Sequence, residues 1–244
     1  MTPEETAAAT AEAISGLGSH FMLDGATYAK GAALGFEGMN FYVAGRGGVL
    51  GHTDGAVVAA TFVFFNPDLV VAGWQQGLDV MPPLRSAEEF AGCAHEWART
   101  HLPDGLDYPR LAELAGTVVA ATAPAIAPLF AGWRTLAEPD AGDAKALALH
   151  RMNALRELRG AYHGAAVIAA GLTPMEAVVY RQPHMAPLFG WVEPYPDPAA
   201  LEARWQQADA LTNRMMGAAL AVLDESERDE LAALANAAHD ATKG

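Results

Sequence analysis

The sequence predicts an all-α protein of about nine to eleven helices that contains a helix-turn-helix-like corner. Apolar residues recur at helical spacing almost throughout, capping residues precede most of these segments, and hydrophobic residues make up 52% of the 244 residues. A pair of strands between residues 41 and 65 is the main alternative. Four glycines interrupt GMNFYVAGRGGVL, and a short apolar run such as the one that follows suits a buried strand or a buried helix.

Capping residues locate the helices of the first half. Thr2 and Pro3 begin a helix that is expected to reach about residue 15. Ser86 and Glu89 form a capping box, which predicts a helix over 87–101. The other helices of this half are expected at 25–34, in TDGAVVAATFVFF, at 67–78, at 108–121 and, broken by two prolines, up to about 136.

The acidic segment EPDAGD is predicted to link two helical halves, residues 1–137 and 144–244, which we expect to pack as one compact unit. The longest helix, about 144–170, opens the second half and ends at Gly171. Helices at 174–181, 198–222 and 225–239 follow, with an ordered loop rich in proline and aromatic residues before the second of these three.

Charge and hydropathy restrict the class of partner. The chain has 29 acidic and 15 basic residues and a net charge of −14, which argues against nucleic acid because DNA-binding proteins neutralise phosphates with Lys and Arg. No apolar run reaches the roughly 18 residues of a membrane span. The acidic start, MTPEETAAATAEA, does not have the pattern of a signal peptide. We therefore expect a cytoplasmic protein without a membrane partner.

The segment HGAAVIAAGLTPMEAVVY has the pattern of a helix-turn-helix. A DNA-reading helix needs polar side chains for base edges and nearby cations for phosphates. Here the second helix is mainly apolar, and Glu176 lies in its first turn. We interpret the corner as structural and keep a DNA-binding transcriptional regulator as the alternative function.

Arg156, Arg159 and His163 share one face of the long helix, because residues three and four apart are neighbours. Two guanidiniums beside an imidazole suit a carboxylate, a phosphate or an enolate, and His163 could act as the acid or base. Gly160 costs this helix about 1 kcal/mol relative to alanine, which indicates a close approach to the backbone. Arg46, flanked by glycines, is a further candidate. The alternative use of Arg156 and Arg159 is pairing with the protein's own carboxylates, and the alternative use of the glycines beside Arg46 is tight packing.

No metal site is predicted. The single cysteine, Cys93, excludes a thiolate cluster, and His95 and His101 are six residues apart, whereas zinc-binding histidines on one helix face are four apart. The chain contains no GxGxxG, GxxxxGK[ST] or GxSxG motif. The sequence therefore assigns no cofactor, and a haem held by one histidine would leave no sequence trace.

Residues 149–177, LHRMNALRELRGAYHGAAVIAAGLTPMEA, resemble the signature LWHAATLLREHRGDGHVAALxxAGLxxxEA of the actinobacterial SCO6745 family, which is also classed as a helix-turn-helix family. YVAGRGGVLG and VVAATFVFFNPDLV are similar to its YFAGRAAPLG and VVAATFYNFxPxLV. The resemblance implies a shared fold and site but no particular reaction. Ala161 stands where the family usually has an acidic residue. The matching polar positions are Tyr42, Arg46, Asn66, His150, Arg156, Glu157, Arg159 and His163.

We therefore predict a protein that binds a small anionic or carbonyl-bearing molecule in an aromatic-lined pocket, with a cofactor-independent enzyme of specialised metabolism as one form of this function. His163 is the candidate catalytic residue. The candidate ligand-binding residues are Arg46, Arg156, Arg159, Tyr42, His150, Tyr162 and Trp191.

A third hypothesis is a partner-binding protein or a homodimer. It rests on two apolar stripes, which would otherwise serve core packing. The stripes consist of Leu201, Trp205, Ala208 and Leu211, and of Leu231, Leu234 and Ala238.

Overall fold

The computed structural model describes residues 1–243, which form thirteen α-helices, four short 3-10 helices and no strand. The all-α prediction is confirmed, although the helices outnumber the nine to eleven expected. The elements are α1 Pro3–Ala9, α2 Ala11–His20, η1 Phe21–Leu23, α3 Gly25–Leu34, α4 Asn40–Gly47, η2 Gly48–Leu50, α5 Gly55–Phe62, α6 Pro67–Val80, α7 Pro83–His101, α8 Tyr108–Ala121, α9 Pro128–Trp133, α10 Ala144–Ala169, α11 Pro174–Arg181, η3 Pro183–Met185, η4 Pro198–Leu201, α12 Glu202–Leu220 and α13 Glu225–Asp240.

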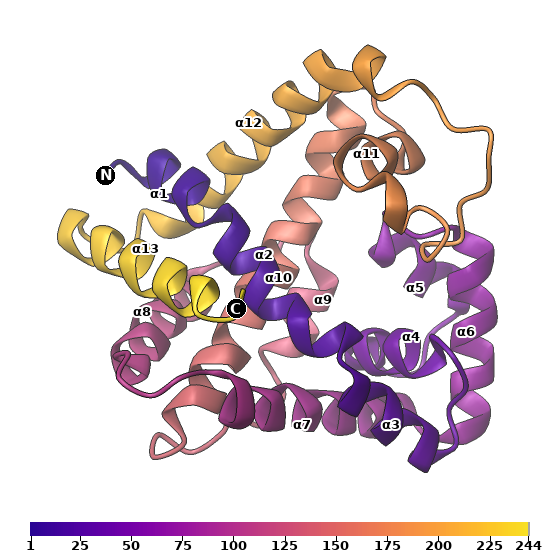
Figure 1. Cartoon of the computed structure of the whole chain (residues 1–244), viewed down its shortest axis with the longest axis horizontal. Helices are drawn as coiled ribbons and strands as arrows, with labels where there is room; N and C mark the ends of the chain where they lie inside the picture. The colour runs from indigo at the N-terminus through magenta and orange to yellow at the C-terminus, as the bar shows by residue number, and fades with distance from the viewer. Residues whose placement is uncertain (244) are drawn as a thin grey trace.

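The long helix α10 passes through the centre of the molecule (Figure 1) and packs against α2, α7, α8, α9 and α12. In Figure 1, α4, α5 and α6 lie on one side of α10, and α1, α12 and α13 lie on the other. One hydrophobic core joins residues from before and after the expected linker, including Phe90 and Leu114 on one side and Leu149 and Leu155 on the other. As a result, side chains on the central part of α10 can reach both groups of helices.

Local capping explains why many helices begin where the sequence predicts. The N-cap side chain accepts a hydrogen bond from a backbone N–H in the first turn, which satisfies one of the unpaired donors there. The residues that cap in this way are Thr2, Asp24, Asp54, Asn66, Asp107, Thr173 and Asp224.

Two expected helices are wrong in detail, one in its continuity and one in its start. The first expected helix is divided at Thr10 into α1 and α2. The second, α7, begins at Pro83 rather than at residue 87, so Ser86 is buried inside the helix and its hydroxyl donates to the carbonyl of Pro82. Glu89 pairs with Lys30 and Arg85 instead of closing a capping box.

The strand alternative for residues 41–65 is also wrong, because this segment forms α4, η2 and α5. The glycines of α4 allow close helix packing. A Cβ on Gly45 would overlap the ring of Phe90 on α7, and one on Gly47 would overlap Val58 on α5. The glycines that weaken this segment as an isolated helix are therefore required by its neighbours.

The C-terminal apolar stripes are used inside the chain. Leu201, Ala208, Leu231 and Ala238 are buried in hydrophobic clusters, and the remaining stripe residues pack against these clusters half-buried. The stripes therefore give no support to a homodimer. No helix within residues 1–243 is both long and apolar enough to cross a membrane.

Candidate functional site

Five of the predicted site residues line a single cavity of about 920 Å³. Helix α4 contributes two of them and α10 contributes three, while α2, the turn after α5, and α12 supply other parts of the wall. The volume lies within the range of about 300–1,000 Å³ that is typical of small-molecule pockets. The five residues are Tyr42, Arg46, Arg156, Arg159 and His163.

Arg46 is fixed by a buried ion pair with Glu157. Its Nε and Nη2 donate to the two carboxylate oxygens at 2.9 and 2.8 Å, and its third nitrogen, Nη1, lies 3.4 Å from the hydroxyl of Tyr42. The guanidinium also lies 4.6 Å from the ring centroid of Phe62, within cation–π distance. Burial raises the pKa of Glu157, but Arg46 and Arg156 outweigh this effect and lower it, so the carboxylate stays ionised.

Arg156 approaches the same carboxylate with one nitrogen. Its Nη1 donates to Oε1 of Glu157 at 2.8 Å, and its side chain is 19% exposed. The stem of Arg156 occupies space left by Gly18 on α2, where a Cβ would lie 2.6 Å from Cδ of the arginine. Nε and Nη2 of Arg156 make no bond to the described residues.

Arg159 is held from α12. Its Nη1 donates to the side-chain oxygen of Asn213 at 3.0 Å, and its Nη2 lies 3.5 Å from the half-exposed carboxylate of Asp209. Burial lowers the pKa of Arg159, with Asp209 opposing the shift. The side chain is 9% exposed, and this guanidinium has no buried carboxylate of its own.

His163 has a defined tautomer. The hydroxyl of Thr212 donates its one proton to the carbonyl of Ala208 at 2.7 Å. At 2.9 Å from Nδ1 of His163, the same oxygen must therefore accept, and Nδ1 carries the ring proton. Burial, reinforced by Arg159, lowers the pKa of His163 to about 4, so the ring is neutral at pH 7. Nε2 then holds the lone pair.

Aromatic side chains form much of the remaining wall and contact these polar groups. Phe62, Phe65 and Tyr42 contact one another, and Phe189 stacks on Phe65 at 4.2 Å between ring centroids. On the other side of the turn, Phe64 and Trp205 contact the ring of His163. The cavity thus has a polar strip along α10 and an aromatic wall built mainly from residues 62–65.

Two β-branched residues of the wall adopt strained backbone conformations. Val63 has φ 42° and ψ −61° in a three-residue turn closed by a hydrogen bond from Phe64 to Phe62, and Ile126 has φ 56°. Such conformations are rare for β-branched residues and concentrate at functional sites. Within residues 1–243 they are the only non-glycine residues with positive φ, and both line this cavity.

The cavity opens at an apolar rim. Leu23, Val57 and Ile126 line it and are 45%, 50% and 62% exposed. The interior, by contrast, holds the side chains of Arg46, Arg156 and Arg159, which pair with two carboxylates, the buried one of Glu157 and the half-exposed one of Asp209. The cavity therefore combines one excess positive charge among these groups with apolar and aromatic surfaces.

Three predicted site residues lie outside this cavity. His150 is buried and pairs through Nδ1 with Nε2 of His95 at 3.0 Å. Tyr162 is half-buried against the core. Trp191 is also half-buried. Its Nε1 donates to the carbonyl of Phe64 at 2.8 Å, and this hydrogen bond stabilises the turn at residues 62–64.

The residues on α12 that hold Arg159 and His163 were missed by sequence analysis. Thr212 lies four residues after Ala208, on the helix face that contains the apolar stripe. A hydroxyl on such a face was the available signal, since a buried polar group needs a partner. Asn213 and Asp209 gave no comparable signal.

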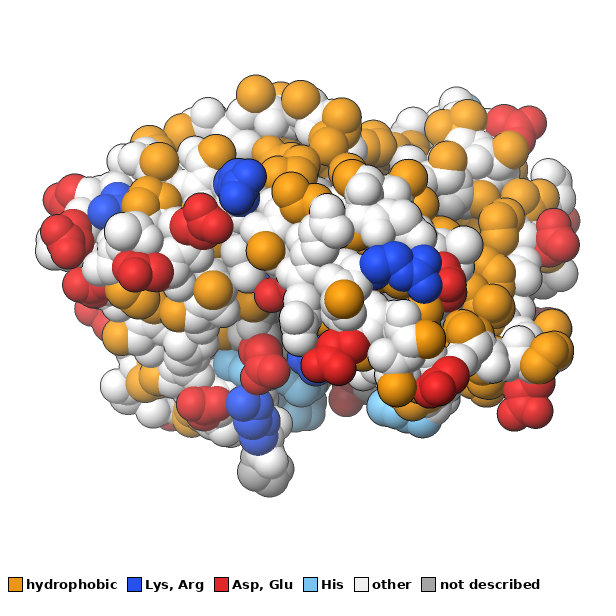
Figure 2. Space-filling model, turned by 90° about the horizontal axis from the view of Figure 1, so that it is seen from above, with side chains coloured by type: hydrophobic (Ala, Val, Ile, Leu, Met, Phe, Trp, Pro, Cys, Tyr) orange, Lys and Arg blue, Asp and Glu red, His pale blue; other side chains and the backbone are white. Residues whose placement is uncertain are grey.

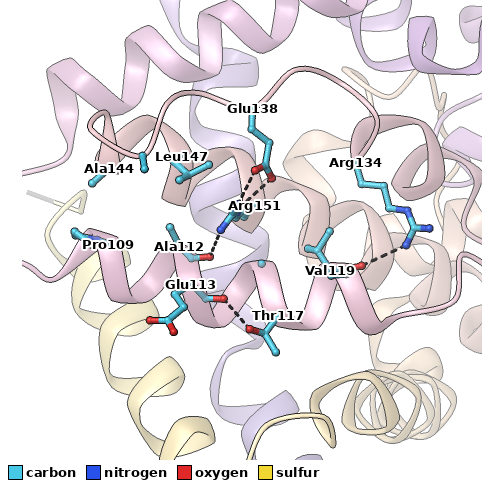
Figure 3. A pocket seen from close by; sticks show the side chains of 13 residues that line it. Pro109, Ala112, Glu113, Thr117, Val119, Arg134, Glu138, Ala144, Leu147 and Arg151 are labelled. Carbon is cyan, nitrogen blue, oxygen red and sulfur yellow. Dashed lines mark hydrogen bonds and ion pairs between the residues drawn. The ribbon is translucent and has the colours of Figure 1, made fainter.

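A second hollow, of about 830 Å³, lies between α8 and α10 (Figure 3). The two arginines that line this hollow already form hydrogen bonds to other groups of the protein. Arg151 donates to both carboxylate oxygens of Glu138 and to the carbonyl of Ala112, and Arg134 donates to backbone carbonyls (Figure 3). This hollow offers a ligand few free donors.

The helix-turn-helix-like corner is present as α10, Gly171 and α11. Gly171 has φ 76°, and Thr173 and Glu176 form the capping box that begins α11. Arg181 is the only exposed residue of α11, whereas Ala177, Val178 and Val179 are buried. The carboxylate of Glu176 lies 3.3 Å from Arg204. The second helix of the corner is therefore packed into the protein along most of its surface.

Basic side chains are scattered on the face of the molecule that Figure 2 shows. Figure 2 shows a face on which acidic side chains are widespread and Lys and Arg occur singly. Among residues 1–243, the cations that form no ion pair with a carboxylate are Arg134, Arg214 and Arg228.

Comparison with known proteins identifies one family. No curated protein and no solved structure matches the chain. A model of a helix-turn-helix family matches residues 7–197, which is more than half of the chain, and the protein therefore belongs to this helix-turn-helix family.

Proposed function

We propose that this protein binds a small organic anion in the cavity between α2, α4, α10 and α12. The observation that carries the proposal is the charge balance of the cavity, in which three arginines meet two carboxylates, of which Glu157 is buried and Asp209 is half-exposed. Buried charge is costly unless it is paired. A ligand carboxylate or phosphate would offset the excess and would bond the free donors of Arg156 and Arg159.

Binding, rather than acid–base catalysis, is the part of the original hypothesis that the geometry supports best. Protonation of His163 would place a second buried cation beside Arg159, so the ring acts first as a hydrogen-bond acceptor. We also propose that the chain is a member of the actinobacterial SCO6745 family, which its sequence resembles. Membership predicts that relatives share Arg46, Arg156, Arg159 and His163.

A DNA-binding regulator is the second candidate, and the helix-turn-helix description of the family supports it. The packing of α11 and the pairing of most cations speak against it. A recognition helix needs an exposed polar face that can enter a groove, with cations beside it for phosphates.

The proposal is tested by a thermal-shift series of carboxylic acids, each measured beside its neutral primary amide. Ligands that bind the native state raise the melting temperature. We expect at least one acid to stabilise the protein more than its amide does. Arg159→Gln should abolish the difference, whereas Arg214→Gln, an exposed arginine on the same α12 that holds Arg159, should retain it. Equal effects of all acids and amides would refute the proposal.

A further inference from the structure

The chemistry of His163 narrows the class of ligand, an inference that rests on the proposed anion site. Nδ1 of His163 donates its proton to the hydroxyl oxygen of Thr212. Thr212 is fully buried, and its hydroxyl donates in turn to the carbonyl of Ala208. Because His163 lines the cavity, Nε2 is the ring nitrogen left to meet a ligand. A neutral imidazole nitrogen with a lone pair accepts a hydrogen bond and has none to donate.

The lone pair has no partner among the described residues, while aromatic rings flank the imidazole. Phe64 and Trp205 lie 5.4 and 5.1 Å from it between ring centroids. Neither supplies the missing donor, because the phenyl ring has none and the indole N–H of Trp205 forms no hydrogen bond to His163, whose hydrogen-bond partner among the described residues is Thr212. A ligand hydroxyl fits this position.

The cation and the acceptor are separated along α10. Arg159 and His163 are four residues apart, which places their Cα atoms about 6 Å apart along the helix axis. Arg156 lies almost one further turn back. Between them, Gly160 lines the cavity, and a Cβ at this position would meet no protein atom within 4 Å. The helix surface between the two polar groups is thus open, and a flat molecule can lie across it.

We propose that the ligand is an aromatic carboxylic acid that carries a hydroxyl group at its far end. Its carboxylate bonds Arg156 and Arg159, its ring lies over Gly160 against the aromatic wall, and its hydroxyl donates to Nε2 of His163. Aromatic groups pack favourably on Phe and Trp side chains, which explains the composition of the wall.

Three hydroxylated acids serve as probes: 4-hydroxybenzoate, 4-hydroxycinnamate and 6-hydroxy-2-naphthoate. Each is compared by isothermal titration calorimetry with its methyl ether and with its primary amide. A site built around a hydrogen bond rejects analogues that lack the bonding group. We expect at least one hydroxy acid to bind about tenfold or more tightly than its ether and its amide.

Two variants separate the two ends of the ligand. Thr212→Val removes the acceptor that fixes the tautomer, so it should erase the preference for hydroxyl over ether and leave the preference for acid over amide. Thr212→Ser keeps the hydroxyl and should restore the first preference. Arg159→Gln should erase the preference for acid over amide and leave the preference for hydroxyl over ether.

The outcomes distinguish this inference from the proposed function. If acids bind better than amides but equally well as their methyl ethers, the hydroxyl assignment is wrong and the anion site stands. If amides bind as well as acids, or if no probe binds, both the inference and the aromatic anion site are overturned.

Discussion

Arg46 and Arg156 share the carboxylate of Glu157 but differ in what they leave free. All three guanidinium nitrogens of Arg46 contact protein groups, whereas Arg156 and Arg159, which line the cavity, keep nitrogens that form no bond to the described residues. All three arginines pair with carboxylates of the protein, as the alternative expected of Arg156 and Arg159, but Arg46 is the one whose donors are all used in this way or by Tyr42. Arg46 organises the site, and the two arginines of α10 are the better candidates for ligand contact.

Removing the buried carboxylate should be more damaging than removing Arg46. Glu157→Gln leaves the buried Arg46 and the half-buried Arg156 without their partner, and we expect a loss of about 3–5 kcal/mol in the free energy of unfolding. Arg46→Met should cost less, because Arg156 still pairs with Glu157. Urea unfolding of both variants measures the difference, and the reverse order would contradict this account of the ion pair.

The face of α10 that Arg156, Arg159 and His163 share could be predicted, because residues three and four apart are neighbours on a helix, which is a purely local rule. The residues that bond these side chains could not be predicted. Glu157 bonds Arg46 over a separation of 111 residues, and Asn213 bonds Arg159 over 54. No local pattern in one sequence reports such pairs. For the same reason, the placement of His150 and Trp191 outside the cavity had no sequence signal.

At the scale of elements, helix starts set by side-chain caps were predictable and those set by packing were not. Asp24, Asp107 and Asp224 mark their helices from within a few residues. The helix α4 depends instead on glycines that fit against Phe90 and Val58, which only the folded chain brings together. Its intrinsic propensity argued for another structure, and tertiary packing overrode that preference.

The packing of α11 leads to a prediction about DNA. An electrophoretic shift assay with genomic fragments at low salt should show no saturable binding, because the helix that would enter the groove is half-buried or buried over nearly all its length. Arg181→Gln should not change the result. Saturable binding that weakens steeply with salt and is lost in Arg181→Gln would instead support the regulator.

At the scale of the whole molecule, three largely buried histidines couple stability to pH. Burial is the largest cause that lowers the pKa of His95, His150 and His163 to about 4, compared with 6.5 in an unfolded chain. Between these values the unfolded chain binds more protons than the folded one. Stability should therefore be fully present above pH 6.5 and should fall as the pH drops towards 4.

The slope of this pH dependence can be measured. Each histidine contributes up to about 1.4 kcal/mol per pH unit within the window. Chemical denaturation from pH 4 to 7 should show the decline, and His163→Gln should reduce the slope. An unfolding free energy that stays constant across this range, or the same slope in His163→Gln, would contradict the assignment of a neutral buried ring.

The most direct test of the cavity as the ligand site is a comparison of Gly160→Ala with Gly92→Ala. Both glycines lie inside helices, and a Cβ at either would meet no protein atom within 4 Å, but only Gly160 lines the cavity. Each substitution should raise the free energy of unfolding by up to about 1 kcal/mol, through helix propensity alone.

The decisive measurement is the affinity of both variants, by calorimetry, for the acid that stabilises the wild type most. We predict that Gly160→Ala, although more stable, binds this acid about tenfold more weakly, and that Gly92→Ala binds it like the wild type. Equal affinity of all three proteins would show that the ligand does not lie over Gly160 and would contradict the assignment of this cavity.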